Sequence, residues 1–354
     1  MMKQLTIVLA LSLQVLSTAA VAIGNPNQPY QNITTLQILA NTLVEAGSPA
    51  AIVTQRWNDS TKTAAAGLAE IAREVRARSK DHFRGGSTTK PWTAVAVLHL
   101  KYLGNLLPQS PSISIRNLLQ MESGLFDVAR DPNFQTPATR YKYWSPTELV
   151  QHGRIAIPIT LSSECSFEKV TGKPIADTYE SVILRPLRLR HTSFPINATT
   201  LPSPALHGYL GDSNGNWTGN ATSDLTDRNP SFAFGNGNIV TPGHDLAEFW
   251  GSLFAGKLLN QTTFSEMLTT VPTNSTGLGG IGSLDYGLGV YSLATPCGTA
   301  YGHVGVIQGY QILALHNPSN NATGVVTLTT NNPPMNLVNA YIGTVLQLLC
   351  QKFE

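Results

Sequence analysis

The chain has 354 residues, of which only 12% are charged, and its net charge is +2. That charged share is about half of the usual one, so the composition indicates neither a basic face for nucleic acid nor an acidic tail. A chain of this length can bury one large core or two closely joined lobes.

Residues 1–22 are predicted to be a secretory signal peptide. Lys3 lies near the front, an apolar stretch covers residues 5–16, and Ala20-Val21-Ala22 resembles a cleavage site. The apolar stretch is too short to cross a bilayer, and no later stretch approaches a spanning length. We therefore expect residues 23–354 to form a secreted, extracellular protein without a membrane span.

The glycosylation sites and the cysteines are two further features that matter for an exported chain. Asn-x-Ser/Thr sites are about twice as frequent as the roughly four expected by chance, so N-glycans are expected. These sites are Asn32, Asn58, Asn197, Asn216, Asn220, Asn260, Asn274 and Asn321. The three cysteines, Cys165, Cys297 and Cys350, allow one disulfide at most, and the sequence leaves the pairing open.

Both ends of the chain predict a helix and a hairpin. Apolar residues at helical spacing cover 35–44, and two runs of small and β-branched residues, 49–57 and 61–68, flank a polar turn. Near the C-terminus, residues 310–330 alternate around another polar turn, and 334–349 close the chain as a helix. Two separated hairpins predict one antiparallel sheet built from both chain ends, with helices packed on it.

The middle of the chain is expected to form an inserted, mainly helical lobe. Ser145 and Glu148 make a capping box for one helix, and residues 113–125, 173–183 and 246–254 predict others. Residues 201–230 are rich in Gly, Asn, Ser and Pro and predict loops. We expect a single domain with a sheet lobe at about 31–86 and 285–354 and a helical lobe at about 87–284.

Between these parts lies the strongest candidate for chemistry, Gly85-Gly86-Ser87-Thr88-Thr89-Lys90, followed by an apolar helix. Ser87 and Lys90 are three residues apart, so on a helix their side chains can meet. A serine is a weak nucleophile until a base takes its proton, and a desolvated lysine can be that base. The pattern predicts acyl transfer; the plain alternative is that Ser87 only caps the helix.

The Ser-x-x-Lys pattern is short enough to arise by chance. A second copy, Ser166 to Lys169, lacks the preceding glycines and is soon followed by Gly172, so we interpret it as the chance one. Tyr301-Gly302-His303-Val304-Gly305-Val306 adds weight to Ser87, because a strand with a glycine lets a substrate approach its backbone N–H groups. A lone strand histidine would more often merely pack.

Together these motifs resemble the serine β-lactamase and penicillin-binding-protein family, in its class C or D-alanyl-D-alanine carboxypeptidase-like branch. Ser87 and Lys90 match its Ser-x-x-Lys, and His303-Val304-Gly305 is similar to its His-x-Gly. Residues 117–125 and 235–247 resemble two further landmarks, in the family's order. The resemblance implies an α+β, β-lactamase/transpeptidase-like fold, with the site in a cleft between sheet and helical lobe.

One family element is missing. A Tyr-x-Asn or Ser-x-Asn is expected shortly before the helix that ends at Gly172, yet neither Tyr nor Asn occurs from Trp144 to Thr178. Residues 155–165 are also too few for the usual loop, motif and helix. Both flanks still match, which favours the omission of a block of sequence over gradual decay. We expect a weak catalyst or none.

The leading hypothesis is a secreted serine hydrolase with Ser87 as nucleophile and Lys90 as its activating partner. His303, Gly305 and Val306 are predicted to bind the substrate, an amide, lactam or ester, without a metal or cofactor. A zinc enzyme is disfavoured because the eight histidines show no H-x-H-x-D or H-E-x-x-H spacing. An α/β-hydrolase is disfavoured because Thr89 stands where a G-x-S-x-G motif around Ser87 would need a glycine. The alternative is a catalytically silent binding protein that keeps the cleft.

Overall fold

The structure is a computed structural model that describes residues 34–99, 114–122, 137–145, 148, 172–211, 223–273, 284–330 and 333–353. The predicted signal peptide, Cys165 and the segment expected to carry Tyr-x-Asn lie outside these residues. Within them, no helix is long and apolar enough to cross a membrane.

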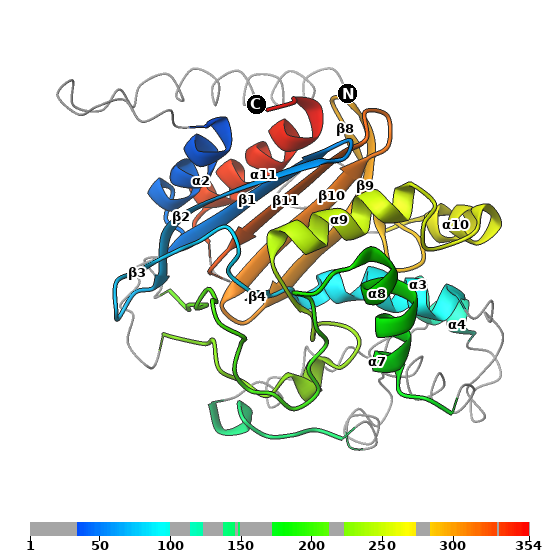
Figure 1. Ribbon diagram of the computed structural model, residues 1–354, viewed down its shortest axis with the longest axis horizontal. Coiled ribbons are helices and arrows are strands. Elements are labelled where there is room, and N and C mark those ends of the chain that lie inside the picture. Colours follow the sequence, from blue (N-terminus) through cyan, green and yellow to red (C-terminus); the bar gives the residue numbers. More distant parts are fainter. Residues whose placement is uncertain are drawn as a thin grey trace.

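The fold is α+β and is built on a nine-stranded antiparallel sheet with the order β3-β2-β1-β11-β10-β9-β8-β7-β6 (Figure 1). Strand β1 pairs with β11, so the sheet joins the two chain ends as the sequence predicted. The strand bounds are β1 Ala50–Trp57, β2 Ser60–Glu70, β3 Val75–Arg76, β6 Val271–Pro272, β7 Leu284–Tyr286, β8 Tyr291–Thr295, β9 Gly298–Ile307, β10 Tyr310–Asn317 and β11 Ala322–Leu328. A separate pair consists of β4 Phe83–Arg84 and β5 Val240–Thr241.

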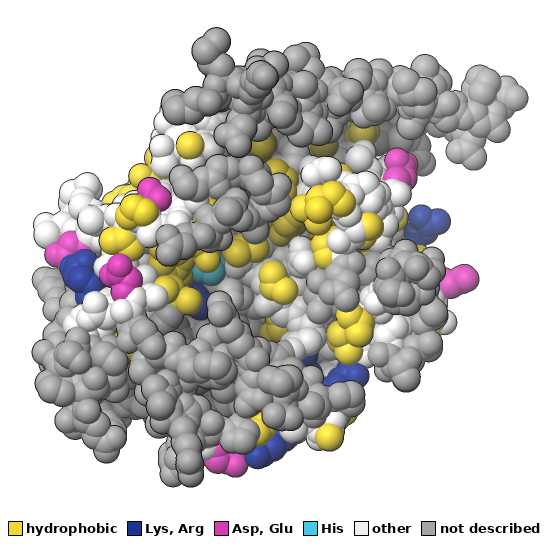
Figure 2. Space-filling view, turned by 180° about the vertical axis from the view of Figure 1, so that it is seen from behind, with side chains coloured by type: hydrophobic (Ala, Val, Ile, Leu, Met, Phe, Trp, Pro, Cys, Tyr) yellow, Lys and Arg dark blue, Asp and Glu magenta, His cyan; other side chains and the backbone are white. Residues whose placement is uncertain are grey.

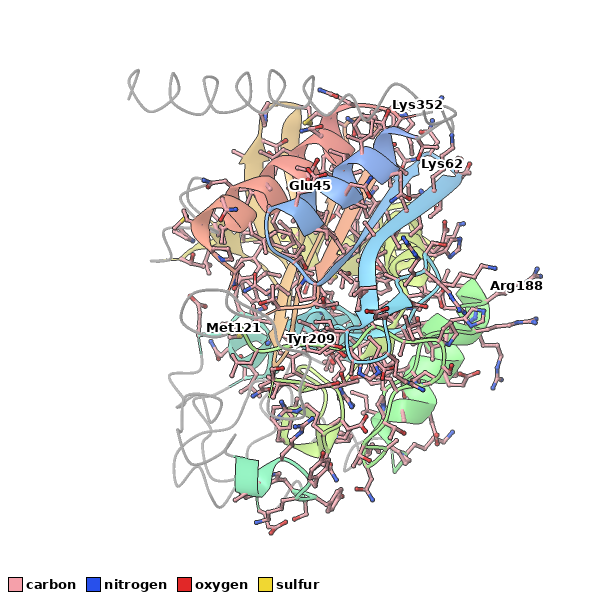
Figure 3. The ribbon with its side chains drawn as sticks, turned by 90° about the vertical axis from the view of Figure 1, so that its left-hand side faces the viewer. Glu45, Lys62, Met121, Arg188, Tyr209 and Lys352 are labelled. Carbon is pink, nitrogen blue, oxygen red and sulfur yellow. A yellow bond between two sulfur atoms is a disulfide. The ribbon has the colours of Figure 1, made fainter. Side chains whose placement is uncertain are left out.

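One face of the sheet is covered by the two terminal helices, α2 (Thr35–Glu45) and α11 (Met335–Cys350), which lie side by side (Figures 1 and 3). Their apolar stripes bury Leu39, Leu43, Val345 and Leu348 against inward-facing strand residues such as Val326. Both helices and both hairpins were predicted, and all four are confirmed.

The other face packs against α9 (Gly243–Phe254) and α3 (Lys90–His99) (Figure 1). Trp92 of α3 stacks on Phe249 of α9 with ring centroids 3.9 Å apart. Residues 91–98 of α3 are buried throughout, so this helix is held from every side. The candidate nucleophile, Ser87, lies in the turn directly before this helix.

Further short helices and 3₁₀ turns occur in the chain besides the helices that cover the sheet. They are α4 Ile115–Leu119, α7 Ile175–Thr178, a π-helical segment Tyr179–Leu184, α8 Arg185–Leu187 and α10 Gln261–Leu268, with 3₁₀ turns at Gly86–Thr89, Pro137–Thr139 and Pro230–Ala233. Ser145 and Glu148 form the predicted capping box, with the Glu148 amide 3.2 Å from the Ser145 hydroxyl. The expected boundaries of the two lobes stay a prediction. Two elements from the range expected for the helical lobe are associated with the sheet: α9 packs on it, and β6 is one of its strands.

The sulfur atoms of Cys297 and Cys350 form a disulfide. Cys297 lies in the turn between β8 and β9, and Cys350 ends α11. The bond therefore fastens the C-terminal helix to the strand that carries His303.

Candidate active site

Ser87 lies in the 3₁₀ turn Gly86–Thr89, which runs directly into α3. Gly86 has a φ of +54°, a left-handed conformation that glycine adopts without strain. Thr88 and Thr89 fold their hydroxyls back onto the carbonyls of Gly85 and Gly86, at 2.9 and 2.7 Å. These bonds fix the turn and leave the half-buried Ser87 side chain facing Lys90.

Lys90 Nζ donates a hydrogen bond to Ser87 Oγ over 2.6 Å, and the same nitrogen lies 3.5 Å from the Asn236 carbonyl oxygen. The predicted contact at the start of a buried helix is confirmed. The N-cap position of this turn is occupied by Gly85, not by Ser87. A serine held against an amine is the arrangement that nucleophilic catalysis requires.

Strand β9 passes alongside this turn. A Cβ atom on Gly305 would lie 3.0 Å from Thr88 Cγ2 and would clash with the Gly85 carbonyl oxygen, and a Cβ on Gly86 would lie 3.1 Å from the Val306 nitrogen. Only two glycines allow the turn and the strand to come this close. His303 shares the face of Gly305, since alternate residues of a strand point the same way.

Near Ser87, one edge of β9 has no partner strand among the described residues. Strand β8 pairs with β9 as far as Gly302, whereas β10 continues to Ile307. Among the described strands, residues 303–307 therefore have β10 as their only partner. Val306 is 52% exposed at this edge. Figure 2 shows the face of the molecule opposite to that in Figure 1. Hydrophobic side chains cluster on this face, and a histidine and a basic side chain are visible among them.

His303 is almost fully buried and both of its ring nitrogens have partners. Nε2 lies 3.0 Å from the Tyr286 hydroxyl, and Nδ1 lies 2.5 Å from the Val304 carbonyl oxygen. Burial, followed by the charge of Lys90, lowers the pKa of His303 to about 3, so the ring is neutral at ordinary pH. Sequence reasoning found His303 but missed Tyr286, whose pairing depends on the register of three strands.

A buried cation supports the chain just before the nucleophile turn. Arg84 is 2% exposed, and its guanidinium donates to the carbonyls of Thr226, Thr199 and Arg228 at 3.0, 2.6 and 3.3 Å. Burial lowers the pKa of Arg84. These bonds hold β4 (Phe83–Arg84) against the loops that contain the three carbonyl groups. Arg84 lies two residues before Gly86, so the start of the nucleophile turn is held in place as well.

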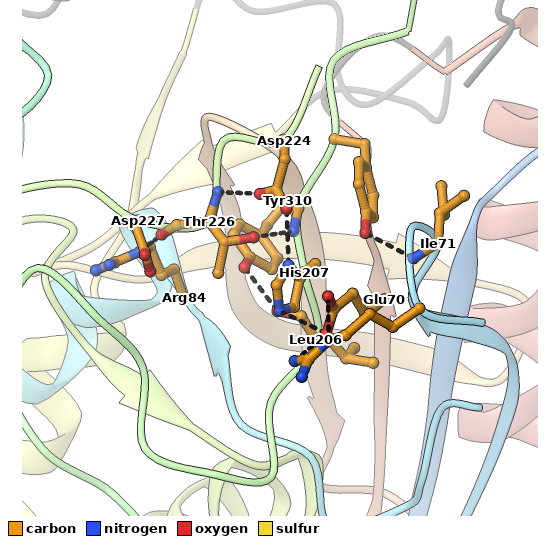
Figure 4. A network of polar contacts seen from close by, with 12 residues as sticks. Glu70, Ile71, Arg84, Leu206, His207, Asp224, Thr226, Asp227 and Tyr310 are labelled. Atoms are coloured by element: carbon orange, nitrogen blue, oxygen red, sulfur yellow. Dashed lines mark hydrogen bonds and ion pairs between the residues drawn. The ribbon is translucent and has the colours of Figure 1, made fainter. Parts of the chain in front are cut away.

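Next to Arg84 lies a polar network that the sequence analysis did not anticipate (Figure 4). His207 Nδ1 lies 2.7 Å from an Asp224 carboxylate oxygen, and its Nε2 lies 3.6 Å from Glu70. The hydrogen bond to Asp224 and the charges of both carboxylates raise the pKa of His207. The network connects the end of β2 with the loops that hold Arg84.

In the described part of the chain, no group of three or more His, Cys, Asp or Glu side chains is arranged so that it could hold a metal ion. What the residues bring together is a paired serine and lysine, a close backbone edge and a buried, neutral histidine.

The family model described as Beta-lactamase matches residues 42–347. The chain belongs to the beta-lactamase family. The matched region contains Ser87, Lys90 and the whole of β9, and the fold is that of the family's serine hydrolases.

Solved structures agree with this assignment. A D-stereospecific amidohydrolase from Streptomyces sp. superposes with a TM-score of 0.73 at 25% identity, covering 88% of this chain and 98% of that one. A D-amino acid amidase from Ochrobactrum anthropi SV3, complexed with L-phenylalanine, gives 0.77 at 20% identity over 88% and 97%. A penicillin binding protein from Bacillus halodurans gives 0.68 at 18% identity over 86% and 98%. The latter two likenesses concern the fold.

Proposed function

We propose that the chain is a serine hydrolase that cleaves amide or ester bonds through an acyl-enzyme on Ser87. The observation that carries the proposal is the 2.6 Å contact between Lys90 Nζ and Ser87 Oγ. Lys90, as the neutral amine, takes the hydroxyl proton while Oγ bonds to the substrate carbonyl carbon. The same proton then passes to the departing amine or alcohol, and water later hydrolyses the ester on Ser87.

The second part of the site is the segment His303 to Val306 of β9. Backbone N–H groups aimed at a developing oxyanion are worth about 10²–10³ in rate each. The close approach of Gly86 to Val306 supports the assignment of this strand edge to substrate binding. Gly305 has a structural part in it, because any side chain there would push the strand off the turn.

The absent Tyr-x-Asn predicts a slow enzyme. Proton transfer by a positioned group typically contributes about 10²–10⁴ in rate, and Lys90 would do this work without its usual partner. His303 offers no replacement base, since both of its nitrogens are already engaged. The second candidate function, a silent binding protein with an intact cleft, is favoured by this absence alone.

A fluorophosphonate probe separates the two functions, because it phosphonylates an activated serine and ignores an ordinary one. We expect labelling of the native chain and of Ser166→Ala, which alters the second Ser-x-x-Lys copy, and none of Ser87→Ala. Equal labelling of Ser87→Ala and the native chain, or no labelling at all, would leave only the binding protein.

We also propose that the protein is exported and glycosylated. The signal-peptide pattern of residues 1–22 supports export. The four described Asn-x-Ser/Thr asparagines, Asn58, Asn197, Asn260 and Asn321, are all exposed, as glycan attachment requires. A mass decrease on treatment of secreted protein with an N-glycosidase is the expected result; an unchanged mass would contradict it.

A further inference from the structure

A hollow of about 520 Å³ lies between the β1–β2 turn and the C-terminal segment, at the end of the sheet away from Ser87. The strand register places Val306, next to the nucleophile turn, level with Ala51. Trp57, which lines the hollow, is farther along β1 by about 20 Å. The hollow is therefore separate from the candidate active site.

The buried side chain of Gln55 fixes the shape of this hollow. Its amide nitrogen donates to the carbonyl oxygens of Leu348 and Gln351 at 2.7 and 2.6 Å. Its carbonyl oxygen accepts from the backbone N–H of Phe353 at 3.0 Å, and Gln55 is only 3% exposed. These bonds hold the C-terminal segment against β1, so that this segment forms one wall. The disulfide at Cys350 fastens the start of that wall.

The opposite wall carries a glycosylation sequence, Asn58-Asp59-Ser60, whose three residues all line the hollow. Asn58 lies in the turn between β1 and β2 with a φ of +53°, a conformation that asparagine adopts more readily than most residues. Among the described residues, no group bonds to its side-chain nitrogen, which is therefore available to a sugar. A sugar attached to Asn58 begins at the rim of the hollow.

The side chains around the hollow have the chemistry that a sugar needs. Trp57 and Phe353 are only partly buried, and an aromatic ring can pack against the apolar C–H face of a pyranose. Lys62 and Lys352 lie close together at this end of the sheet (Figure 3). Neither lysine forms an ion pair with a described residue, so both can donate to sugar hydroxyls. The volume is within the range of small-molecule sites, about 300–1,000 Å³.

We propose that the first sugars of an N-glycan on Asn58 occupy this hollow and join the β1–β2 turn to the C-terminal segment. The proposal rests on the proposed export and glycosylation of the chain. In the attachment step, the Asn58 side-chain nitrogen bonds to the anomeric carbon of an oligosaccharide carried on a lipid pyrophosphate. The bond from that carbon to the pyrophosphate breaks, the lipid pyrophosphate departs, and the nitrogen gives up one proton.

The rate at which glycans are released from the folded, secreted protein tests this proposal. Peptide mapping after timed treatment with an N-glycosidase gives the rate at each asparagine. The references are the other occupied sites, above all Asn260, which caps α10 ahead of β6 at the other edge of the sheet. We expect Asn58 to carry a glycan and to lose it about tenfold more slowly or less, because the enzyme can act only when the sugars leave the hollow. Equal rates in the folded protein, or a difference that persists after denaturation, would overturn the proposal.

Two substitutions of Trp57 show whether its ring holds the sugars. Trp57→Ala should remove most of the protection, whereas Trp57→Phe keeps a ring and should keep most of it. Native-like protection in a Trp57→Ala variant that circular dichroism shows to be folded overturns the proposal. If that variant does not fold, Phe353→Ala makes the same test from the other wall. A bare Asn58 beside other occupied sites defeats this inference alone, and a protein without any glycan defeats the proposed glycosylation with it.

Discussion

Lys90 is the side chain on which the proposed chemistry depends most. It begins α3, and its amine contacts Ser87. Replacing it with methionine keeps an unbranched apolar stem of similar length and removes only the amine. We expect Lys90→Met to slow fluorophosphonate labelling of Ser87 by about 10²–10⁴, the usual contribution of a positioned base.

The matched control for this experiment is Lys80→Met, which removes an exposed lysine ahead of β4. It should label at the native rate. Native-like labelling of Lys90→Met, with circular dichroism showing both variants folded, would mean that another group activates Ser87.

His207 gives the stability of the fold a dependence on pH. Its pKa is raised by the hydrogen bond to Asp224, so the folded state holds the proton more tightly than the unfolded chain. The resulting stability is fully present below the unfolded pKa of about 6.5 and is lost as the pH rises through the folded pKa. His207→Gln should therefore lower the urea midpoint clearly at pH 5.5 and less at pH 9. A loss of equal size at both values would contradict an imidazolium between the two carboxylates.

At the scale of elements, the nucleophile turn and β9 are held together by glycines. A Cβ on Gly305 would clash with the Gly85 carbonyl oxygen, which is backbone and has little freedom to move. We expect Gly305→Ala to destabilise the fold by about 1–3 kcal/mol, as overpacking does, and to abolish labelling of Ser87. Chemical denaturation and probe labelling measure the two effects.

Gly343 provides the opposite case. It lies inside α11, and a Cβ there would meet no atom within 4 Å. Gly343→Ala should stabilise the fold by about 0.5–1 kcal/mol through helix propensity and leave labelling unchanged. If both glycine variants behaved alike, the close packing of β9 on the turn would not be what makes Gly305 necessary.

The regular elements were predictable because their signals are local. The hairpin strands alternate, and α2 and α11 carry apolar stripes, so β1, β2, β10 and β11 follow from pattern alone. The 3₁₀ turn at Ser87 was expected as a helix start; its form depends on Gly86 lying against β9. Likewise, the π-helical segment was predicted as ordinary helix, and its Tyr179 stacks on Phe194 from a distant loop.

The site was predictable to the same extent. Ser87 and Lys90 are three residues apart, so helix geometry brings them together whatever the rest of the chain does. Tyr286 reaches His303 only because β8 sets the register between their strands. Arg84 and His207 are held by contacts with loops. Loops have no periodic sequence pattern, so such contacts cannot be predicted from a single sequence.

At the scale of the whole molecule, the disulfide joins segments 53 residues apart in the sequence and ties α11 to the sheet. The N- and C-terminal parts of the sheet meet where β1 pairs with β11, and α11 packs on that face, so loosening α11 exposes the apolar core between α11 and the sheet. Cys350→Ser should lower the free energy of unfolding by about 2–4 kcal/mol, measured by urea denaturation. An unchanged midpoint would show that α11 packs well enough without the bond.

The central claim is that Ser87 carries the acyl group. Mixing the protein with the 3-carbamoylphenyl ester of phenylacetic acid, quenching in acid and mapping the peptides tests it most directly. We predict a phenylacetyl adduct on the peptide that contains Ser87, absent from Ser87→Ala and retained in Ser166→Ala. An unmodified Ser87 peptide while 3-hydroxybenzamide is released, or an adduct on another residue, would contradict the claim.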